Sequence, residues 1–280
     1  MSRDTSFYYS FLVLPPRKRT ATIAVWDFCR AVDDAVDESE SPERAAQEVA
    51  AWRAELDAIF TDAVPRTWQG RALQPFVREF SLPRTPFEEL IDGVAMDLAQ
   101  VRYDTFDALA GYCRRVASAV GLICVEVFGY SDPRAQSYAM NLGIALQLTN
   151  IVRDIAADLQ RGRIYLPRED LDRFGVNEED LRAGHVTPAM RALLKFECTR
   201  AREYYLRAAT ELPPADAYTL MAAEIMGGIY FEILQRIERA GYDVFTRRIR
   251  VPRPYRAVIA LRIWARTLLR MPRLALGTGR

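Results

Sequence analysis

The chain has 280 residues, half of them hydrophobic, so it is long enough to bury a sizeable apolar core. Its 38 basic and 37 acidic residues leave a net charge of +1, which argues against a dedicated nucleic-acid-binding protein. A single histidine and four cysteines without a C-x-x-C pair do not supply the ligands of a usual zinc site.

Apolar residues follow the helical period along almost the whole chain, and the alternating pattern of strands is scarce. The sequence therefore predicts an all-α fold. No linker separates two parts, so we expect a single domain over residues 1–280, with a basic C-terminal segment from about residue 246.

The first long helix is expected over residues 18–36, after Pro15-Pro16 breaks the chain. It runs into an acidic stretch in which Asp33 and Asp37 are four residues apart. Side chains at this spacing share one helix face, about 5–6 Å apart at Cβ. Most such charges lie on a solvated helix face, but the apolar residues around this stretch weaken that interpretation and favour a bound cation.

Further helices are expected over residues 41–60, 70–80 and 86–98, the first of them opened by Ser41 and Pro42. A long apolar helix fits residues 106–128. Small residues gather in it and in the helix that follows: Ala117, Ser118, Ala119, Gly121, Gly143 and Ala145. They indicate either close helix packing or room for an elongated apolar ligand between helices.

The next helix, expected over residues 133–158, carries a polar stripe within an apolar sequence. Steps of three and four residues place the members of this stripe on one face: Gln147, Asn150, Asp154 and Asp158. Burying such a stripe without partners would be costly. A metal ion and a polyanion would provide the partners.

Arginines accompany the second acidic stretch. Arg153 precedes Asp154, and Arg161, Arg163 and Tyr165 follow in a loop over residues 161–167. Arginine matches phosphate oxygens with two parallel hydrogen bonds. Acid pairs that bind Mg²⁺, with arginines beside them, are what the ionisation of a diphosphate requires, because cations stabilise the charge of the leaving group. An apolar, aromatic-lined cavity would shelter the carbocation.

Beyond two turns or short helices, the pattern predicts helices over residues 188–212, 215–240 and 255–269. No acidic residue follows Asp243, whereas arginines recur to the end of the chain. Around residues 256–271, apolar residues alternate with Arg262, Arg266 and Arg270. This segment is either a helix packed on the bundle or an interfacial helix on anionic lipid.

The scattered cysteines are typical of buried thiols in a reducing cytosol. Residues 1–7 contain no apolar signal run, and the longest apolar stretches are far short of the ~20 residues that span a bilayer. We therefore expect a cytoplasmic protein, either soluble or peripheral to the inner face of the membrane. His185 lies in a turn-like segment and is assigned no catalytic role.

At this point the motifs match a known family. The chain resembles the squalene and phytoene synthases, which join two isoprenyl diphosphates head to head. The motifs that carry the resemblance lie at residues 5–10, 14–16, 28–37, 112–117, 147–154 and 161–167. Residues 5–16 and 236–245 look most like the bacterial presqualene diphosphate synthases of hopanoid biosynthesis.

This resemblance implies an isoprenoid-synthase helical bundle with a central apolar cavity. By analogy, Asp33 and Asp37 bind Mg²⁺ on one helix, and Asn150, Asp154 and Asp158 bind it on the facing helix. The four aspartates and Arg153 would be the catalytic residues. The positions that match substrate contacts are Ser6, Arg30, Arg153, Arg163, Tyr165 and Tyr230 for diphosphate, and Trp26 and Gln147 for the prenyl chain.

Two positions depart from the family pattern. Ala156 and Ala157 stand where the second acidic motif usually carries Gly-Glu, but the spacing of Asp154 and Asp158 is intact, so the metal assignment is kept. Trp26 replaces a usual tyrosine, which puts a hydroxyl contact in doubt.

The leading hypothesis is the condensation of two farnesyl diphosphates to presqualene diphosphate, with several Mg²⁺ ions and without NADPH. A squalene synthase, or a phytoene synthase that uses geranylgeranyl diphosphate, is the alternative within the family. A non-catalytic helical scaffold that binds a membrane or a partner is the alternative from a different class, suggested by the arginine-rich C-terminal segment.

Overall fold

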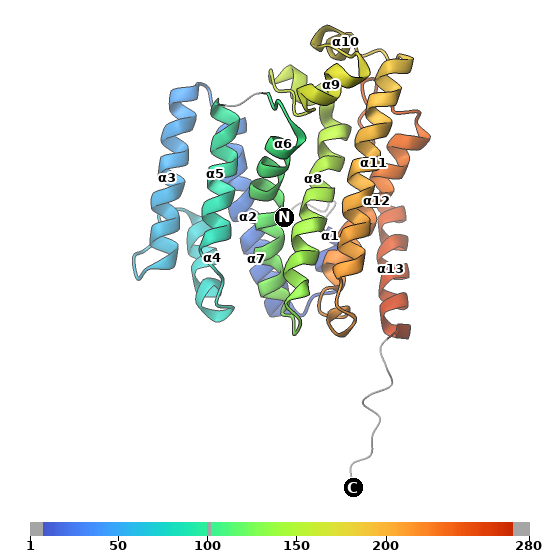
Figure 1. The fold of residues 1–280 in the computed structure, drawn as a ribbon. Helices are drawn as coiled ribbons and strands as arrows, with labels where there is room; N and C mark the ends of the chain where they lie inside the picture. Colours follow the sequence, from blue (N-terminus) through green and yellow to red (C-terminus); the bar gives the residue numbers. More distant parts are fainter. Residues whose placement is uncertain (1–7, 100–101, 271–280) are drawn as a thin grey trace.

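The computed structural model describes residues 8–99 and 102–270, and their regular structure is helical (Figure 1). Within those ranges, the only pairing of extended segments is an isolated bridge between Arg102 and Ile164. The predicted all-α fold is therefore confirmed.

The elements agree closely with the helices expected from the sequence. In chain order they are α1 (Tyr8–Phe11), α2 (Pro16–Asp37), α3 (Pro42–Phe60), α4 (Trp68–Glu79), α5 (Thr85–Ala99), α6 (Phe106–Cys113), η1 (Arg114–Ser118), α7 (Ala119–Phe128), α8 (Arg134–Gln160), α9 (Arg168–Phe174), α10 (Glu178–Ala183), α11 (Pro188–Glu211), η2 (Pro214–Asp216), α12 (Met221–Arg239) and α13 (Arg253–Arg270). The predicted start at Ser41 is confirmed, since its side chain accepts a hydrogen bond from the Arg44 backbone N–H.

Two elements differ from the expectation. A turn of π-helix, η1, interrupts the helix predicted over residues 106–128. The helix predicted from residue 215 begins only at Met221, because a 3₁₀ turn, η2, precedes it. The carboxylate of Asp216 in that turn accepts hydrogen bonds from the backbone N–H and the hydroxyl of Ser131, so it ties η2 to the start of α8.

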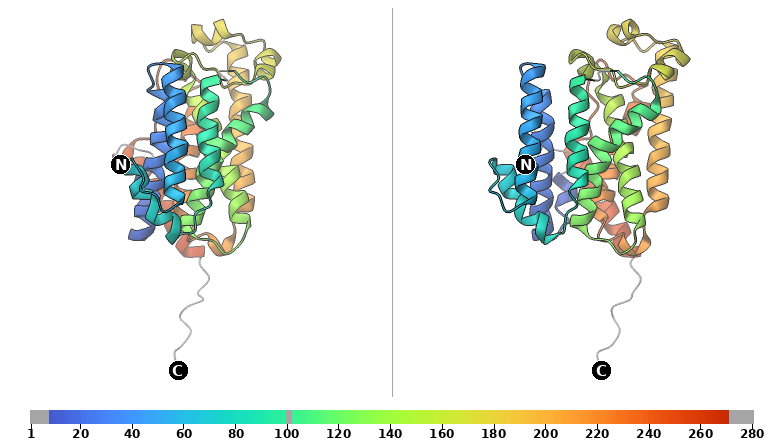
Figure 2. Two further views of the ribbon diagram at one scale, coloured as in Figure 1. Left: turned by 90° about the vertical axis from the view of Figure 1, so that its left-hand side faces the viewer. Right: turned by 60° about the vertical axis from the view of Figure 1, so that its left-hand side comes forward.

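The long helix α8 runs through the middle of the bundle (Figures 1 and 2). It packs against α11 and α12 on one side and against η1 and α7 on the other. Helices α2, α3, α4 and α5 pack together beyond α7, while α13 packs on the outer side of α12. The arrangement places the two acidic helices, α2 and α8, on either side of the bundle interior.

The segment from Phe106 to Phe128 corrects one expectation from the sequence. It is 23 residues long with a mean hydropathy of 1.4, so among the described helices it is long and apolar enough to cross a membrane. The statement that no apolar stretch reaches this length was wrong. In the structure η1 and α7 pack between α5 and α8, so packing within the bundle accounts for their apolar character.

The small residues of this region serve close packing and also leave space. A Cβ placed on Gly143 of α8 would lie 2.6 Å from the Ser118 Cα of η1, so the two backbones touch there. Gly143 also borders a cavity, together with Ala117 and Gly121. The two interpretations of the small residues therefore describe the same helix contact.

Candidate active site

A cavity of about 380 Å³ lies between α2, η1, α7, α8 and α12. Its wall changes character along the helices. The residues at the carboxyl ends of α2 and α8 are charged: Asp33, Asp37, Arg153, Asp154, Asp158, Arg161 and Arg163. The opposite end is apolar and is closed by Phe11, Val25, Phe128, Tyr138, Ala139 and Ala223. This shape suits an elongated molecule with an anionic head and an apolar tail.

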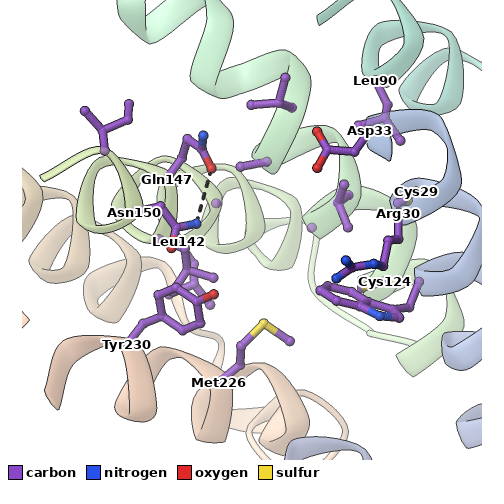
Figure 3. A pocket seen from close by; sticks show the side chains of 18 of the residues that line it. Cys29, Arg30, Asp33, Leu90, Cys124, Leu142, Gln147, Asn150, Met226 and Tyr230 are labelled. Carbon is purple, nitrogen blue, oxygen red and sulfur yellow. Dashed lines mark hydrogen bonds between the residues drawn. The ribbon is translucent and has the colours of Figure 1, made fainter. Parts of the chain in front are cut away.

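The two acidic stretches face each other across this cavity. Asp33 projects from α2 into the space, and Gln147 and Asn150 of α8 lie on the opposite wall (Figure 3). Because Asp37, Asp154 and Asp158 border the same cavity, all four predicted aspartates are brought together. The pair on α2 and the pair on α8 lie more than a hundred residues apart in the sequence.

Ion pairs neutralise one aspartate on each wall. The carboxylate of Asp37 accepts a hydrogen bond from Arg163 at 2.6 Å and lies 3.1 Å from the Arg161 guanidinium. Asp154 pairs with the neighbouring Arg153 and with Arg248, whose Nε and Nη2 donate to it at 2.9 and 3.0 Å. These contacts join α2 and the segment after α12 to the end of α8.

The other two aspartates have no ion-pair partner among the described residues. Burial, and then the negative charge of Asp154, raise the pKa of Asp158 to about 7. Asp33 keeps some contact with solvent, but the protein packed around its carboxyl group removes part of its hydration. This desolvation, and then the negative charges of the nearby Asp37 and Asp97, raise its pKa to about 6. Asp154 itself has a lowered pKa, because its arginine partners outweigh the effect of burial. One uncompensated carboxyl group therefore remains on each wall.

Asn150 supplies a further oxygen atom that lacks a hydrogen-bond partner among the described residues. Its amide nitrogen donates weakly to Gln147 at 3.4 Å, but its carbonyl oxygen is buried and, within the described part of the chain, accepts no hydrogen bond (Figure 3). An unpaired buried oxygen costs free energy that a ligand would recover. The oxygen atom of an amide is also a ligand for a hard divalent cation.

The remaining predicted contacts lie along the same cavity. Trp26, Arg30 and Tyr230 border it, and the guanidinium of Arg153 lies 6.0 Å from the centre of the Tyr230 ring. Arg30 also contacts Asp34 at 3.4 Å. Ser6 lies outside the described residues, so its predicted contact with diphosphate stays a prediction.

Sequence reasoning missed a buried cluster beside this site. Tyr112 and Tyr165 donate hydrogen bonds to the two carboxylate oxygens of Asp97 at 2.9 and 3.0 Å, and Arg163 lies 3.9 Å from the same group. Burial raises the pKa of Asp97 despite these partners. The hydroxyl of Tyr165, expected to contact diphosphate, is thus held by Asp97. The signal that could have revealed it was Asp97 between the apolar residues Met96 and Leu98 near the end of α5.

The carboxylate and amide oxygens of this site suit Mg²⁺ that binds together with a phosphate-bearing substrate. No three acidic, histidine or cysteine side chains of the described residues converge on one point, so they form no closed metal cage. Magnesium, however, is commonly held by one or two carboxylates and completes its coordination with water and phosphate oxygens. The free carboxyl groups of Asp33 and Asp158 and the unpaired oxygen of Asn150 fit that mode.

Comparisons with known proteins identify a family for this chain. A family model described as squalene/phytoene synthase matches residues 1–255. The 15-cis-phytoene synthase of a Synechocystis species is 37% identical over 275 residues, which cover 93% of this chain and 81% of the relative. Phytoene synthase 2 of Solanum lycopersicum is 35% identical over 273 residues, covering 94% of this chain and 87% of the relative.

Two solved structures share the fold. A dehydrosqualene synthase has a TM-score of 0.87 at 28% identity, over 95% of this chain and 93% of its own. The squalene synthase HpnC of Alicyclobacillus acidocaldarius has a TM-score of 0.75 at 33% identity, over 85% of this chain and 89% of its own. The helical bundle described above is therefore the isoprenoid-synthase fold of these enzymes.

Proposed function

The chain belongs to the squalene/phytoene synthase family, and from this premise we propose that it condenses two farnesyl diphosphates head to head into presqualene diphosphate. The family predicted from the sequence motifs is thereby confirmed, and with it a prenyltransferase type of enzyme. The observation that carries the proposal is the pair of facing acidic walls, lined by arginines, at one end of a cavity whose other end is apolar.

The charged end would hold the diphosphate groups. Asp33 and Asp37 on α2, and Asn150, Asp154 and Asp158 on α8, would hold Mg²⁺. When bound, Mg²⁺ neutralises the charge that builds on a departing diphosphate. Arg153, Arg161 and Arg163 border the same end and would bind the remaining phosphate oxygens.

The proposed reaction breaks the bond between C1 and oxygen in one farnesyl diphosphate, which leaves an allylic cation and inorganic diphosphate. The 2,3-double bond of the second molecule attacks C1 of this cation. Loss of a proton from that carbon then closes a cyclopropane, and the released diphosphate takes the proton. The product keeps one diphosphate group, so no reductant is consumed.

The apolar end would protect the cation. Phe11, Phe128 and Tyr138 close it, and each of these side chains is at most 3% exposed. Little of their surface is therefore accessible to water, which would quench the cation. The aromatic ring faces also attract a positive charge.

A second candidate is a phytoene synthase that acts on geranylgeranyl diphosphate, because the curated relatives named above are phytoene synthases. One structural neighbour is named a squalene synthase, which raises a third outcome, squalene formed with NADPH. All three share the first condensation, so the candidates differ in chain length and in the fate of the cyclopropane. Nothing in the cavity favours a non-catalytic scaffold.

Product analysis separates these candidates. Purified protein is incubated with Mg²⁺ and either farnesyl or geranylgeranyl diphosphate, with and without NADPH. Presqualene diphosphate from farnesyl diphosphate without NADPH supports the proposal. Product from geranylgeranyl diphosphate alone would establish a phytoene synthase, and squalene that appears only with NADPH would establish a squalene synthase. Either result would replace the proposed function.

A further inference from the structure

Helix α13 packs on the bundle through one face only. Ile259 and Ile263 pack with Met221, Ile225 and Ile229 of α12. The contact is close at Gly228, where an added Cβ would lie 2.7 Å from the Ile263 side chain. This inner face satisfies the expectation of a helix packed on the bundle.

The outer face of α13 is also apolar, although it faces solvent. We call it the outer stripe; its residues and exposed fractions are Val258 (40%), Leu261 (61%), Trp264 (42%), Leu268 (37%) and Leu269 (86%). At 100° per residue these positions cover the side of the helix that points away from α12. Single exposed apolar residues are ordinary on a protein surface, but a contiguous row of large ones marks an interaction site.

The charges beside the outer stripe are of one sign. Arg262 and Arg266 are exposed on α13, one turn apart. Asp243 is the last acidic residue of the chain, so no carboxylate on this helix neutralises them. A partner that covers the stripe must therefore offer both an apolar interior and negative charge. A second copy of the same face would bring like charges together.

We propose that α13 lies along an anionic phospholipid surface, with the outer stripe inserted between the acyl chains and Arg262 and Arg266 on lipid phosphates. An amphipathic helix with this division of residues binds in the plane of the membrane interface. The inner contacts with α12 then fix the orientation of the whole bundle on the bilayer.

This orientation also places the cavity near the lipid. Helix α1 packs against both α12 and α13. Its Phe11 closes the apolar end of the cavity, while the next residue, Leu12, is 44% exposed on the outside. If the proposed function holds, the apolar chains of the product at that end of the cavity lie one short helix away from the acyl chains of the membrane. Docking itself does not depend on that function.

Vesicle sedimentation tests the docking surface. Full-length protein is mixed with vesicles of phosphatidylcholine alone, or of phosphatidylcholine with phosphatidylglycerol, and the bound fraction is measured at low and high salt. The test variant is Leu261→Gln/Trp264→Gln/Leu268→Gln. The matched control is Trp68→Gln/Leu206→Gln, which alters exposed apolar residues (57% and 62%) far from α13 along the chain. Arg262→Gln/Arg266→Gln tests the charge, with the exposed Arg168→Gln as its control.

We expect wild-type protein to bind the phosphatidylglycerol vesicles, with a bound fraction that decreases as salt is added. Binding should fall about tenfold or more in both test variants and should be unchanged in both controls. All altered side chains are exposed, so the variants should retain the wild-type melting temperature. Equal sedimentation of the stripe variant and wild type would overturn the proposal. A second outcome would also overturn it: wild-type protein that is a dimer and binds neither kind of vesicle, together with a stripe variant that is a monomer. A second copy of the chain would then cover the stripe. Because no substrate is present, this outcome is independent of the product assay.

Discussion

At the scale of single residues, the site divides its carboxylates into two kinds. Asp37 and Asp154 are compensated by arginines, whereas Asp33 and Asp158 have raised pKa values of about 6 and about 7. The D-x-x-x-D spacing predicted which aspartates share a helix face. It could not predict that Arg248 contacts Asp154, or that Asp97 holds Tyr165, because both contacts depend on how distant segments pack.

The raised pKa of Asp158 predicts how the stability of the metal-free protein depends on pH. Between its ordinary pKa of 3.8 and about 7, the folded protein keeps a proton that the unfolded chain has lost. The free energy of unfolding should therefore fall as pH rises through this window. One pKa unit corresponds to about 1.4 kcal/mol, and solvent screening removes part of it, so we expect a loss of about 1–3 kcal/mol.

Denaturant unfolding of metal-free protein at several pH values checks this expectation. Asp158→Asn should flatten the profile and should be more stable than wild type above pH 7, about where the carboxyl ionises. Asp34→Asn on the same helix as Asp33 serves as the control, because Asp34 does not border the cavity. Parallel pH profiles for wild type and Asp158→Asn would contradict the assignment of this group.

At the scale of the elements, the positions of most helices could be predicted from periodicity and start signals. The π turn η1 could not, since nothing in its sequence departs from an ordinary helix. Its position becomes understandable from packing. Val116 and Ala117 of η1 border the cavity, and the backbone around Ser118 meets Gly143 of α8. Such turns are frequent at functional sites.

The close contact between α8 and η1 involves Gly143 but not Gly111, so substitutions of these two glycines should have different effects. Gly143→Ala should destabilise the protein by about 1–3 kcal/mol, because its Cβ would meet backbone atoms at 2.6 Å that cannot move aside. Gly111→Ala in α6 should be neutral or stabilising by up to about 1 kcal/mol, since its nearest neighbours are flexible arginine ends at 3.7 Å or more. Thermal unfolding measures both; equal melting temperatures would show that the two backbones do not touch as described.

A buried charge cluster fixes α9, the helix that follows the loop carrying Arg163 and Tyr165. That loop leads into α9, where Asp170 accepts a hydrogen bond from Arg200 of α11 at 2.7 Å. Glu197 shares the same guanidinium at 2.8 Å, and both acidic side chains are at most 5% exposed. Removing the arginine leaves two buried carboxylates unpaired, so Arg200→Met should cost about 3–5 kcal/mol.

The control for this substitution is Arg207→Met on the same helix, whose exposed ion pair with Glu203 spans 3.9 Å. Exposed pairs contribute at most about 1 kcal/mol, so this variant should unfold close to wild type. Urea titrations of the two variants compare them directly. A similar midpoint for both would mean that the buried cluster does not hold α9 on α11.

At the scale of the whole molecule, the family and the all-α fold could be predicted from the sequence, but the shape of the cavity could not. Phe11, Phe128 and Tyr138 come from three separate elements, and only the folded chain brings them together at the apolar end. The length of prenyl chain that fits depends on that end, which is why product analysis is needed to choose between farnesyl and geranylgeranyl substrates.

The central claim is that two acidic walls act together on one diphosphate. The most direct measurement is the Mg²⁺-dependent release of inorganic diphosphate from the accepted prenyl diphosphate by wild type, Asp33→Asn, Asp154→Asn and the control Asp34→Asn, with circular dichroism to confirm the fold. We predict that Asp33→Asn and Asp154→Asn each lose about a hundredfold or more of turnover while remaining folded, and that Asp34→Asn retains it. Full turnover in either cavity variant would contradict the account, because one wall of the site would then take no part in the chemistry.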